Sequence, residues 1–161
     1  MIKFGEFHAT NEKFKRMKNI LVAVDLKEGT EELLKFAKQF AQQYLAKVWI
    51  IHVAAPDPDF VGYAVGPQYI RDMRATELKE EHHTLKSYAD DLMFNGIAAE
   101  SVMLNGATVE MLTAEIAKLH ADLLIVGHHR HGILHRAFFG RTDVAIIEHI
   151  DIPTLVVPIK N

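Results

Sequence analysis

The chain has 161 residues, of which 49% are hydrophobic and 24% charged, the size and composition of one ordinary globular domain. A formal net charge of −3 and the lack of cysteine exclude a disulfide framework and a cysteine-based zinc site, and argue against nucleic-acid or anionic-lipid partners. No apolar run approaches the roughly 18 residues of a membrane span, and the N-terminus lacks the apolar core of a secretory signal, so we expect a cytoplasmic protein.

The first part of the chain differs from the rest. Residues 1–16 have no sustained hydrophobic period and are interpreted as an N-terminal extension, followed by one domain at 17–161. The extension is either disordered or docked through Phe4, Phe7 and Phe14, and its mixed polar composition favours disorder.

Apolar runs then alternate with amphipathic segments. In chain order we predict a strand at 19–25, a helix at 31–44, a strand at 47–54, a helix at 68–95, a strand at 98–104, a helix along Val109, Leu112, Ile116 and Leu119, a strand at 121–127, a helix at 138–149 and a strand at 154–159. Most strands are continuously apolar, which is typical of a parallel sheet covered by helices on both faces. The Pro/Gly-rich connection at 56–67 is longer than most and is a candidate functional loop.

Right-handed crossovers between such strands give a doubly wound sheet, which binds ligands at the carboxyl ends of its strands where the strand order reverses. Two orders fit the periodicity. In 2-1-3-4-5 the reversal lies between strands 1 and 3, and in 3-2-1-4-5 it lies between strands 1 and 4. The second order would bring Asp25 beside Gly127.

The segment IVGHHRHGILHRAFFGRTD (125–143) follows the fourth strand and carries Gly127, Gly132 and Gly140. Glycines there let backbone N–H groups approach an anion, and the N-terminus of a following helix adds a favourable dipole. The spacing is neither a Walker loop nor a dinucleotide-binding fingerprint. A phosphate-binding loop and ordinary turn glycines are both compatible with it.

Several segments together resemble the universal stress protein family over about residues 17–160. They are NILVAVD at 19–25, VWIIHV at 48–53, ADLLIVG at 121–127, the glycine loop, and the closing EHIDIPTLVVP. The resemblance implies an α/β fold with a five-stranded, doubly wound parallel sheet of order 3-2-1-4-5. It also implies a homodimer joined through the last strand, and ATP or another adenine nucleotide, with or without Mg²⁺, at the carboxyl edge of strands 1, 2 and 4.

The family's nucleotide-binding members carry Gly-x2-Gly-x9-Gly-Ser/Thr after the fourth strand. Gly127 and Gly140 match the first and last glycines, whereas Arg130 replaces the second and Arg141 replaces the Ser/Thr, with Thr142 one place later. The resemblance therefore implies a partly altered nucleotide site made by Ala23, Asp25, Val53, Val126, Gly127, Arg130, Gly140, Arg141 and Thr142.

Within that set, Ala23 and Asp25 match positions that contact the adenosine part, and Val53 matches the position whose backbone reads the adenine edge. Asp25 also fits an ordinary turn or cap. Arg130 would strain a left-handed loop by roughly 1 kcal/mol, yet guanidinium groups suit phosphate oxygens. The arginines either close the site or bind phosphate in another way.

Three functions remain open. The first is a dimeric stress-response or signalling module that binds ATP, ADP, AMP or cyclic AMP, without dedicated catalytic activity. The second is a family member that binds no nucleotide and acts through protein–protein contacts, and the third is a weak ATP hydrolase. The sequence carries no nucleophile elbow or paired-carboxylate motif that would favour an enzyme.

Histidines and the closing strand complete the pattern. Residues 128–135 hold four histidines, and the spacing of His131 and His135 suits two metal ligands on a helix, but Gly132 disfavours a helix there and no metal site is predicted. His52, inside an apolar strand, is interpreted as a hydrogen-bonded core histidine.

Pro158 places the strand 154–159 at an edge or a strand end, and pairing across a twofold axis would cover that edge.

Overall fold

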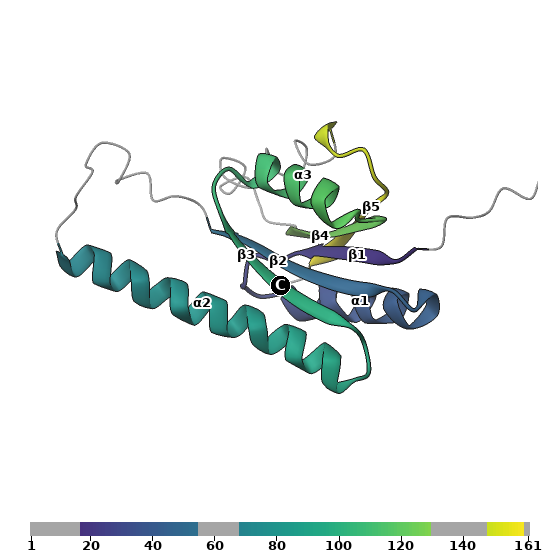
Figure 1. Ribbon diagram of the computed structural model, residues 1–161, viewed down its shortest axis with the longest axis horizontal. Coiled ribbons are helices and arrows are strands. Elements are labelled where there is room, and N and C mark those ends of the chain that lie inside the picture. Colours follow the sequence, from purple (N-terminus) through teal and green to yellow (C-terminus); the bar gives the residue numbers. More distant parts are fainter. Residues whose placement is uncertain (1–16, 55–67, 130–147, 160–161) are drawn as a thin grey trace, which may run out of the picture.

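The computed structural model describes residues 17–54, 68–129 and 148–159, and its five strands form one parallel sheet in the order β3-β2-β1-β4-β5 (Figure 1). The fold class and strand order expected from the sequence are confirmed. The elements are β1 (Asn19–Ala23), α1 (Thr30–Tyr44), β2 (Lys47–Ala54), α2 (Gln68–Phe94), β3 (Ala99–Asn105), α3 (Thr108–Leu119), β4 (Leu123–His129) and β5 (Thr154–Ile159).

The bounds of these helices and strands agree to within two residues with those predicted from the sequence, and the larger differences have local causes. β1 ends at Ala23 rather than at Asp25, because the chain turns there and Leu26 has a left-handed φ of 60°. β4 begins two residues later than predicted, because Asp122 belongs to the preceding turn, where its carboxylate accepts the backbone N–H of Lys18 at 2.8 Å and of Asn19 at 3.1 Å.

Two predicted segments fall mostly outside the described residues. These are the candidate loop 56–67 and most of the predicted helix 138–149, of which Glu148 and His149 are described and are helical.

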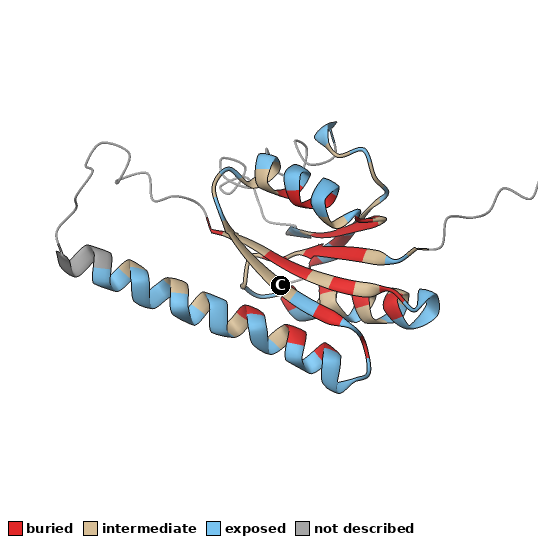
Figure 2. Cartoon of the chain, viewed as in Figure 1, coloured by how far each residue is buried: buried red, intermediate tan, exposed pale blue. Residues whose placement is uncertain are grey.

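The two faces of the sheet are covered by different helices. On one face, Val22, Ile50 and Ile125 pack with Leu33 of α1 and Leu85 of α2. Because successive strand residues point to opposite faces, the neighbouring strand positions pack against α3 on the other face, in a cluster of Leu21, Ile51, Leu112, Ile116, Ala121, Leu124 and Val126. Figure 2 shows this buried layer running along the strands.

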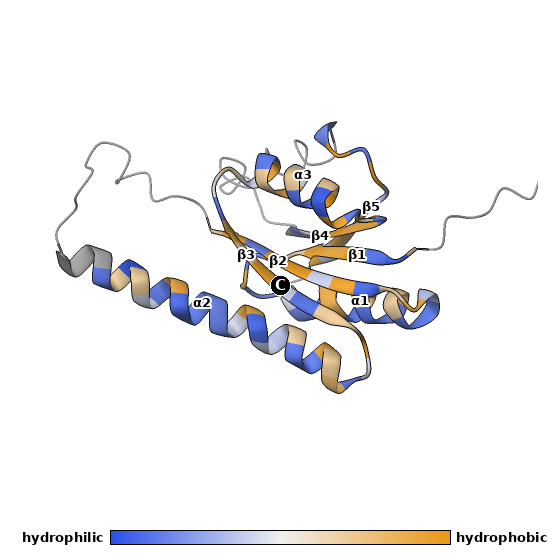
Figure 3. Ribbon diagram, viewed as in Figure 1, coloured by the Kyte–Doolittle hydropathy of each residue, from blue (hydrophilic) through white to orange (hydrophobic). Residues whose placement is uncertain are grey.

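The core explains most of the stability of the fold. Among the described residues, large side chains such as Leu33, Ile50 and Ile125 are almost fully buried, and full burial of one Leu, Ile or Val side chain contributes about 1.5–3 kcal/mol. Figure 3 shows hydrophobic strands and a largely hydrophilic outer surface on α2. In the described part of the chain, no helix is both long enough and apolar enough to cross a membrane.

Candidate functional site

Three of the predicted site residues meet at the carboxyl edge of the sheet. Ala23, the last residue of β1, pairs in register with Ile51 of β2 and with Val126 of β4. Val53 lies two residues beyond Ile51 and therefore shares its face. Ala23, Val53 and Val126 all pack in the cluster beneath α3, so they form one apolar floor on the α3 face.

Asp25 follows this floor in the turn between β1 and α1. Its side-chain oxygen accepts the backbone N–H of Lys27 at 3.0 Å, the geometry of an Asx turn. Leu26, between them, has a left-handed φ of 60°, a conformation that costs a non-glycine residue about 1–2 kcal/mol. The carboxylate of Asp25 therefore shapes a strained turn at the edge, whatever else it contacts.

Gly127 lies beside the same edge, but its missing side chain faces the opposite side of the sheet. A Cβ added at Gly127 would lie 2.5 Å from Cδ1 of Ile159 and 3.2 Å from Cδ1 of Leu33. Its φ is not left-handed. The structure thus gives this glycine a packing role that the sequence did not reveal. The other loop residues of the predicted site lie outside the described residues: Arg130, Gly140, Arg141 and Thr142.

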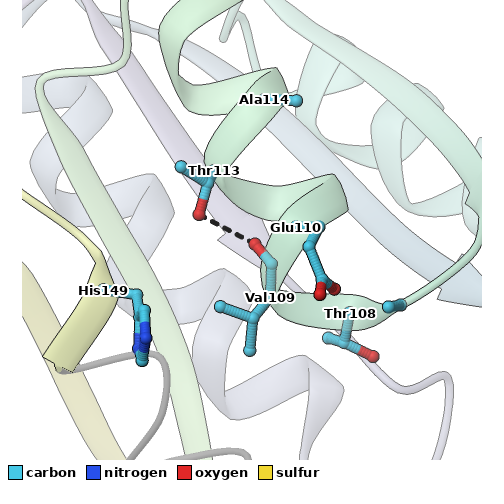
Figure 4. A pocket seen from close by; sticks show the side chains of 7 residues that line it. Thr108, Val109, Glu110, Thr113, Ala114 and His149 are labelled. Atoms are coloured by element: carbon cyan, nitrogen blue, oxygen red, sulfur yellow. Dashed lines mark hydrogen bonds between the residues drawn. The ribbon is translucent and has the colours of Figure 1, made fainter.

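A hollow of about 780 Å³ opens beside the start of α3 (Figure 4), within the range of small-molecule sites, about 300–1,000 Å³. The described residues that line it are Ala107, Thr108, Val109, Glu110, Thr113, Ala114 and His149. Val109 also packs against the cluster that holds Ala23, Val53 and Val126. The hollow and the apolar floor therefore adjoin through Val109.

Sequence reasoning missed this hollow. Val109 was predicted only as part of a helical stripe, and the residues that face His149 across the hollow carry no motif. The Thr113 hydroxyl donates to the Val109 carbonyl at 2.8 Å (Figure 4). Among the described residues of the lining, Glu110 and His149 have ionisable side chains.

Metal binding finds no support in the described part of the chain. No three His, Asp or Glu side chains gather there as a possible metal site. The spaced pair of His131 and His135 lies outside the described residues. A Mg²⁺ ion held with a nucleotide thus remains a prediction from the sequence.

Comparison with known proteins gives one family. The model of the universal stress protein family matches residues 17–158. Universal stress protein C of Salmonella typhimurium is 28% identical over 143 residues, covering 89% of this chain and 96% of that protein. Universal stress protein A of Escherichia coli is 27% identical over 144 residues, with the same coverage.

Solved structures share the fold at lower identity. A universal stress protein in complex with cAMP is 19% identical with a TM-score of 0.62, covering 88% of this chain and 97% of that one. A universal stress protein from Archaeoglobus fulgidus in complex with dAMP is 20% identical with a TM-score of 0.62, covering 90% and 99%. A family protein from Arabidopsis thaliana with AMP bound is 16% identical with a TM-score of 0.63, covering 89% and 92%.

Proposed function

The chain belongs to the universal stress protein family, and on that basis we propose that it binds an adenine nucleotide at the carboxyl edge of β1, β2 and β4. The observation that carries the proposal is the register that brings Ala23 beside Val126, with Val53 on the same face. These side chains form an apolar floor that suits the flat face of a purine.

The surroundings of the floor support the same ligand class. Asp25 supplies a carboxylate at the end of β1, next to the floor, and carboxylates accept hydrogen bonds from hydroxyl and amino groups. The adjoining hollow of about 780 Å³ is large enough for a nucleotide. Three solved relatives are described with cAMP, dAMP or AMP, so adenine monophosphates are the first ligands to test, with ADP and ATP beside them.

The phosphate end of the ligand would face the loop after β4. We propose that Gly127, Gly140 and Thr142 hold phosphate together with Arg130 and Arg141, whose guanidinium groups form paired hydrogen bonds with phosphate oxygens. In this function the protein acts as a nucleotide-responsive module, and no step of catalysis is required.

Calorimetry with AMP, cyclic AMP, ADP and ATP tests the proposal. We expect binding by the wild type and a loss of about tenfold in Asp25→Ala, the size of one hydrogen bond to a charged group. Asp90→Ala, which changes an exposed carboxylate on α2, is the matched control and should bind like the wild type. No binding of any of the four at millimolar concentration would rule out the proposal.

A second candidate is a family member that acts through protein contacts alone. The replacement of two motif positions by Arg130 and Arg141 favours it. The edge position of β5 suits a twofold dimer in either case, because Val156 is 38% exposed on that strand and an apolar edge needs a partner. A thermal-shift screen separates the candidates, since a ligand that binds the folded state raises its melting temperature.

A further inference from the structure

His52 on β2 is hydrogen-bonded to the end of β1, on the face of the sheet opposite the apolar floor of the proposed site. Its ring Nδ1 lies 2.8 Å from the carbonyl oxygen of Val24, as expected for a hydrogen-bonded core histidine. A carbonyl oxygen only accepts, so Nδ1 carries the hydrogen and donates it. The N–H of Val24 donates to the carbonyl of Ile51 at 2.8 Å. Both backbone polar groups of Val24 are therefore tied to β2.

Val24 directly precedes the strained turn of Asp25. Leu26, with its left-handed φ of 60°, packs its side chain against the core on the α1 and α2 face, and Asp25 accepts the N–H of Lys27 at 3.0 Å. Such a turn persists only where its surroundings hold it. The hydrogen bond from His52 to Val24 is one of these restraints, and it acts on the residue next to the proposed ligand-binding carboxylate.

The other ring nitrogen of His52 faces a carboxyl group. Nε2 lies 3.9 Å from Oε2 of Glu81 on α2, and the two side chains are 12% and 31% exposed. Oε2 of Glu81 is buried and has no hydrogen-bond partner. Because Nδ1 already carries the hydrogen, neutral His52 and ionised Glu81 present two acceptors to each other. One added proton, on either group, supplies the missing donor, and the two atoms then form a hydrogen bond when the side chains close the 3.9 Å between them.

Glu81 is the ionisable side chain that contacts His52 among the described residues. β1 offers His52 a backbone carbonyl, and the register partner on β3 is Met103. On α2, Glu77 lies one turn away and pairs with Arg74 at 3.2 Å. The charged residues of the turn into α1 are Asp25, Lys27 and Glu28.

We propose that His52 is a positioning residue for the Asp25 turn, and that a proton shared with Glu81 makes this turn, and ligand affinity at the site, depend on pH. The dependence on ligand rests on the proposed adenine-nucleotide function. With the proton present, His52 bridges β1 and α2 and the turn is held more firmly. Without it, the ring keeps only its bond to Val24, and the turn loosens.

Affinity for cyclic AMP is measured by calorimetry between about pH 5.5 and pH 8, where histidine changes charge. This ligand keeps one negative charge throughout, so its own titration does not contribute. We expect the affinity of the wild type to rise about 5-fold from pH 8 to the acid end, the effect of one hydrogen bond. The affinity of Glu81→Gln should not change over this range. The amide nitrogen of Glu81→Gln donates to Nε2 of the neutral ring, and its amide oxygen accepts from Nε2 of the protonated ring, so this variant has a hydrogen-bond partner for His52 at every pH.

Two substitutions at His52 separate positioning from packing. His52→Asn keeps a donor for the Val24 carbonyl, so it should retain affinity near that of the wild type at pH 8 and lack the Glu81-dependent pH effect. His52→Leu removes the donor and should bind about 5-fold more weakly than the wild type at pH 8, the effect of one lost hydrogen bond. Its affinity should not change with pH. His83→Asn on the exposed surface of α2 is the control and should keep the wild-type pH profile.

A ligand-free measurement decides the positioning claim separately. In NMR spectra, the backbone amide shifts of Asp25 and Lys27 should follow protonation of the His52 ring in the wild type and should not follow it in Glu81→Gln. Equal pH profiles for wild type and Glu81→Gln, or amide shifts in the turn that ignore the ring, would overturn the proposal. If no nucleotide binds, the proposed function fails, and the amide shifts alone decide whether His52 positions the turn.

Discussion

Gly127 of β4 and Ile159 of β5 are in such close contact that a Cβ on the glycine would lie 2.5 Å from Cδ1 of the isoleucine. Real Cβ atoms do not approach other atoms this closely, so the two residues fit only because one has no side chain. This contact lies on the α1 and α2 face, whereas the apolar floor of the proposed ligand site lies on the α3 face. Gly127 therefore has a structural role apart from any phosphate.

Gly127→Ala should destabilise the fold by about 1–3 kcal/mol, the usual effect of overpacking a core. Ile159→Val removes the clashing Cδ1, so the double variant should recover part of that loss. Urea unfolding of the four proteins gives the coupling energy between the two positions. If Gly127→Ala lowers the free energy of unfolding equally in the wild type and in the Ile159→Val variant, packing against Ile159 is not the cause of the loss.

Asp122 should be important for the N-terminal edge of the sheet. Its carboxylate accepts the backbone N–H of Lys18 and of Asn19 at 2.8 and 3.1 Å. Asp122→Ala removes the acceptor of both bonds and should destabilise the fold by about 1–2 kcal/mol, the net contribution of two hydrogen bonds that are exposed or part-buried. Urea unfolding measures this loss. Asp90→Ala, on the exposed side of α2, should stay within about 0.5 kcal/mol of the wild type, and similar values for both variants would contradict the role of Asp122.

The arginines of the loop after β4 should act on phosphate rather than on adenosine. Arg130→Ala and Arg141→Ala should each weaken AMP binding by about tenfold, the effect of a charged hydrogen bond. Adenosine, which has no phosphate, should bind these variants and the wild type equally. Calorimetry with both ligands makes the comparison. Tighter AMP binding by the variants would instead mean that the arginines close the site.

The edge strand β5 should join two copies of the chain. We expect the wild type to have twice the 18.2 kDa mass of the chain in light scattering. Val156→Lys places a charge on the exposed edge strand and should give monomers, because lysine at an edge blocks strand pairing. Met73→Lys, at a position 60% exposed on α2, is the control and should remain dimeric. A monomeric wild type would rule out this interface.

Much of the fold could be predicted because it rests on local patterns. Apolar runs mark the strands, and amphipathic segments mark α1 and α3. The strand order could not be read from these patterns, since periodicity does not say which strands pair, and it came from the family resemblance. The meeting of Ala23 with Val126 then followed from that order.

The contacts between distant elements could not be predicted from one sequence. Nothing local in the sequence shows that Glu81 of α2 faces His52 of β2. Likewise, the close contact between Ile159 and Gly127 depends on the exact register of β4 and β5. The hollow beside α3 is lined by residues from the start of α3 and by His149, which are far apart in the sequence, and no motif predicts that they meet.

The most direct test of the proposed ligand site is an NMR titration with AMP. We predict that the backbone amide shifts of Ala23, Asp25, Val53 and Val126 change with one common affinity, while those of the far end of α2 near Phe94 do not. No change at millimolar AMP, or changes confined to residues away from the carboxyl edge, would contradict nucleotide binding at this site.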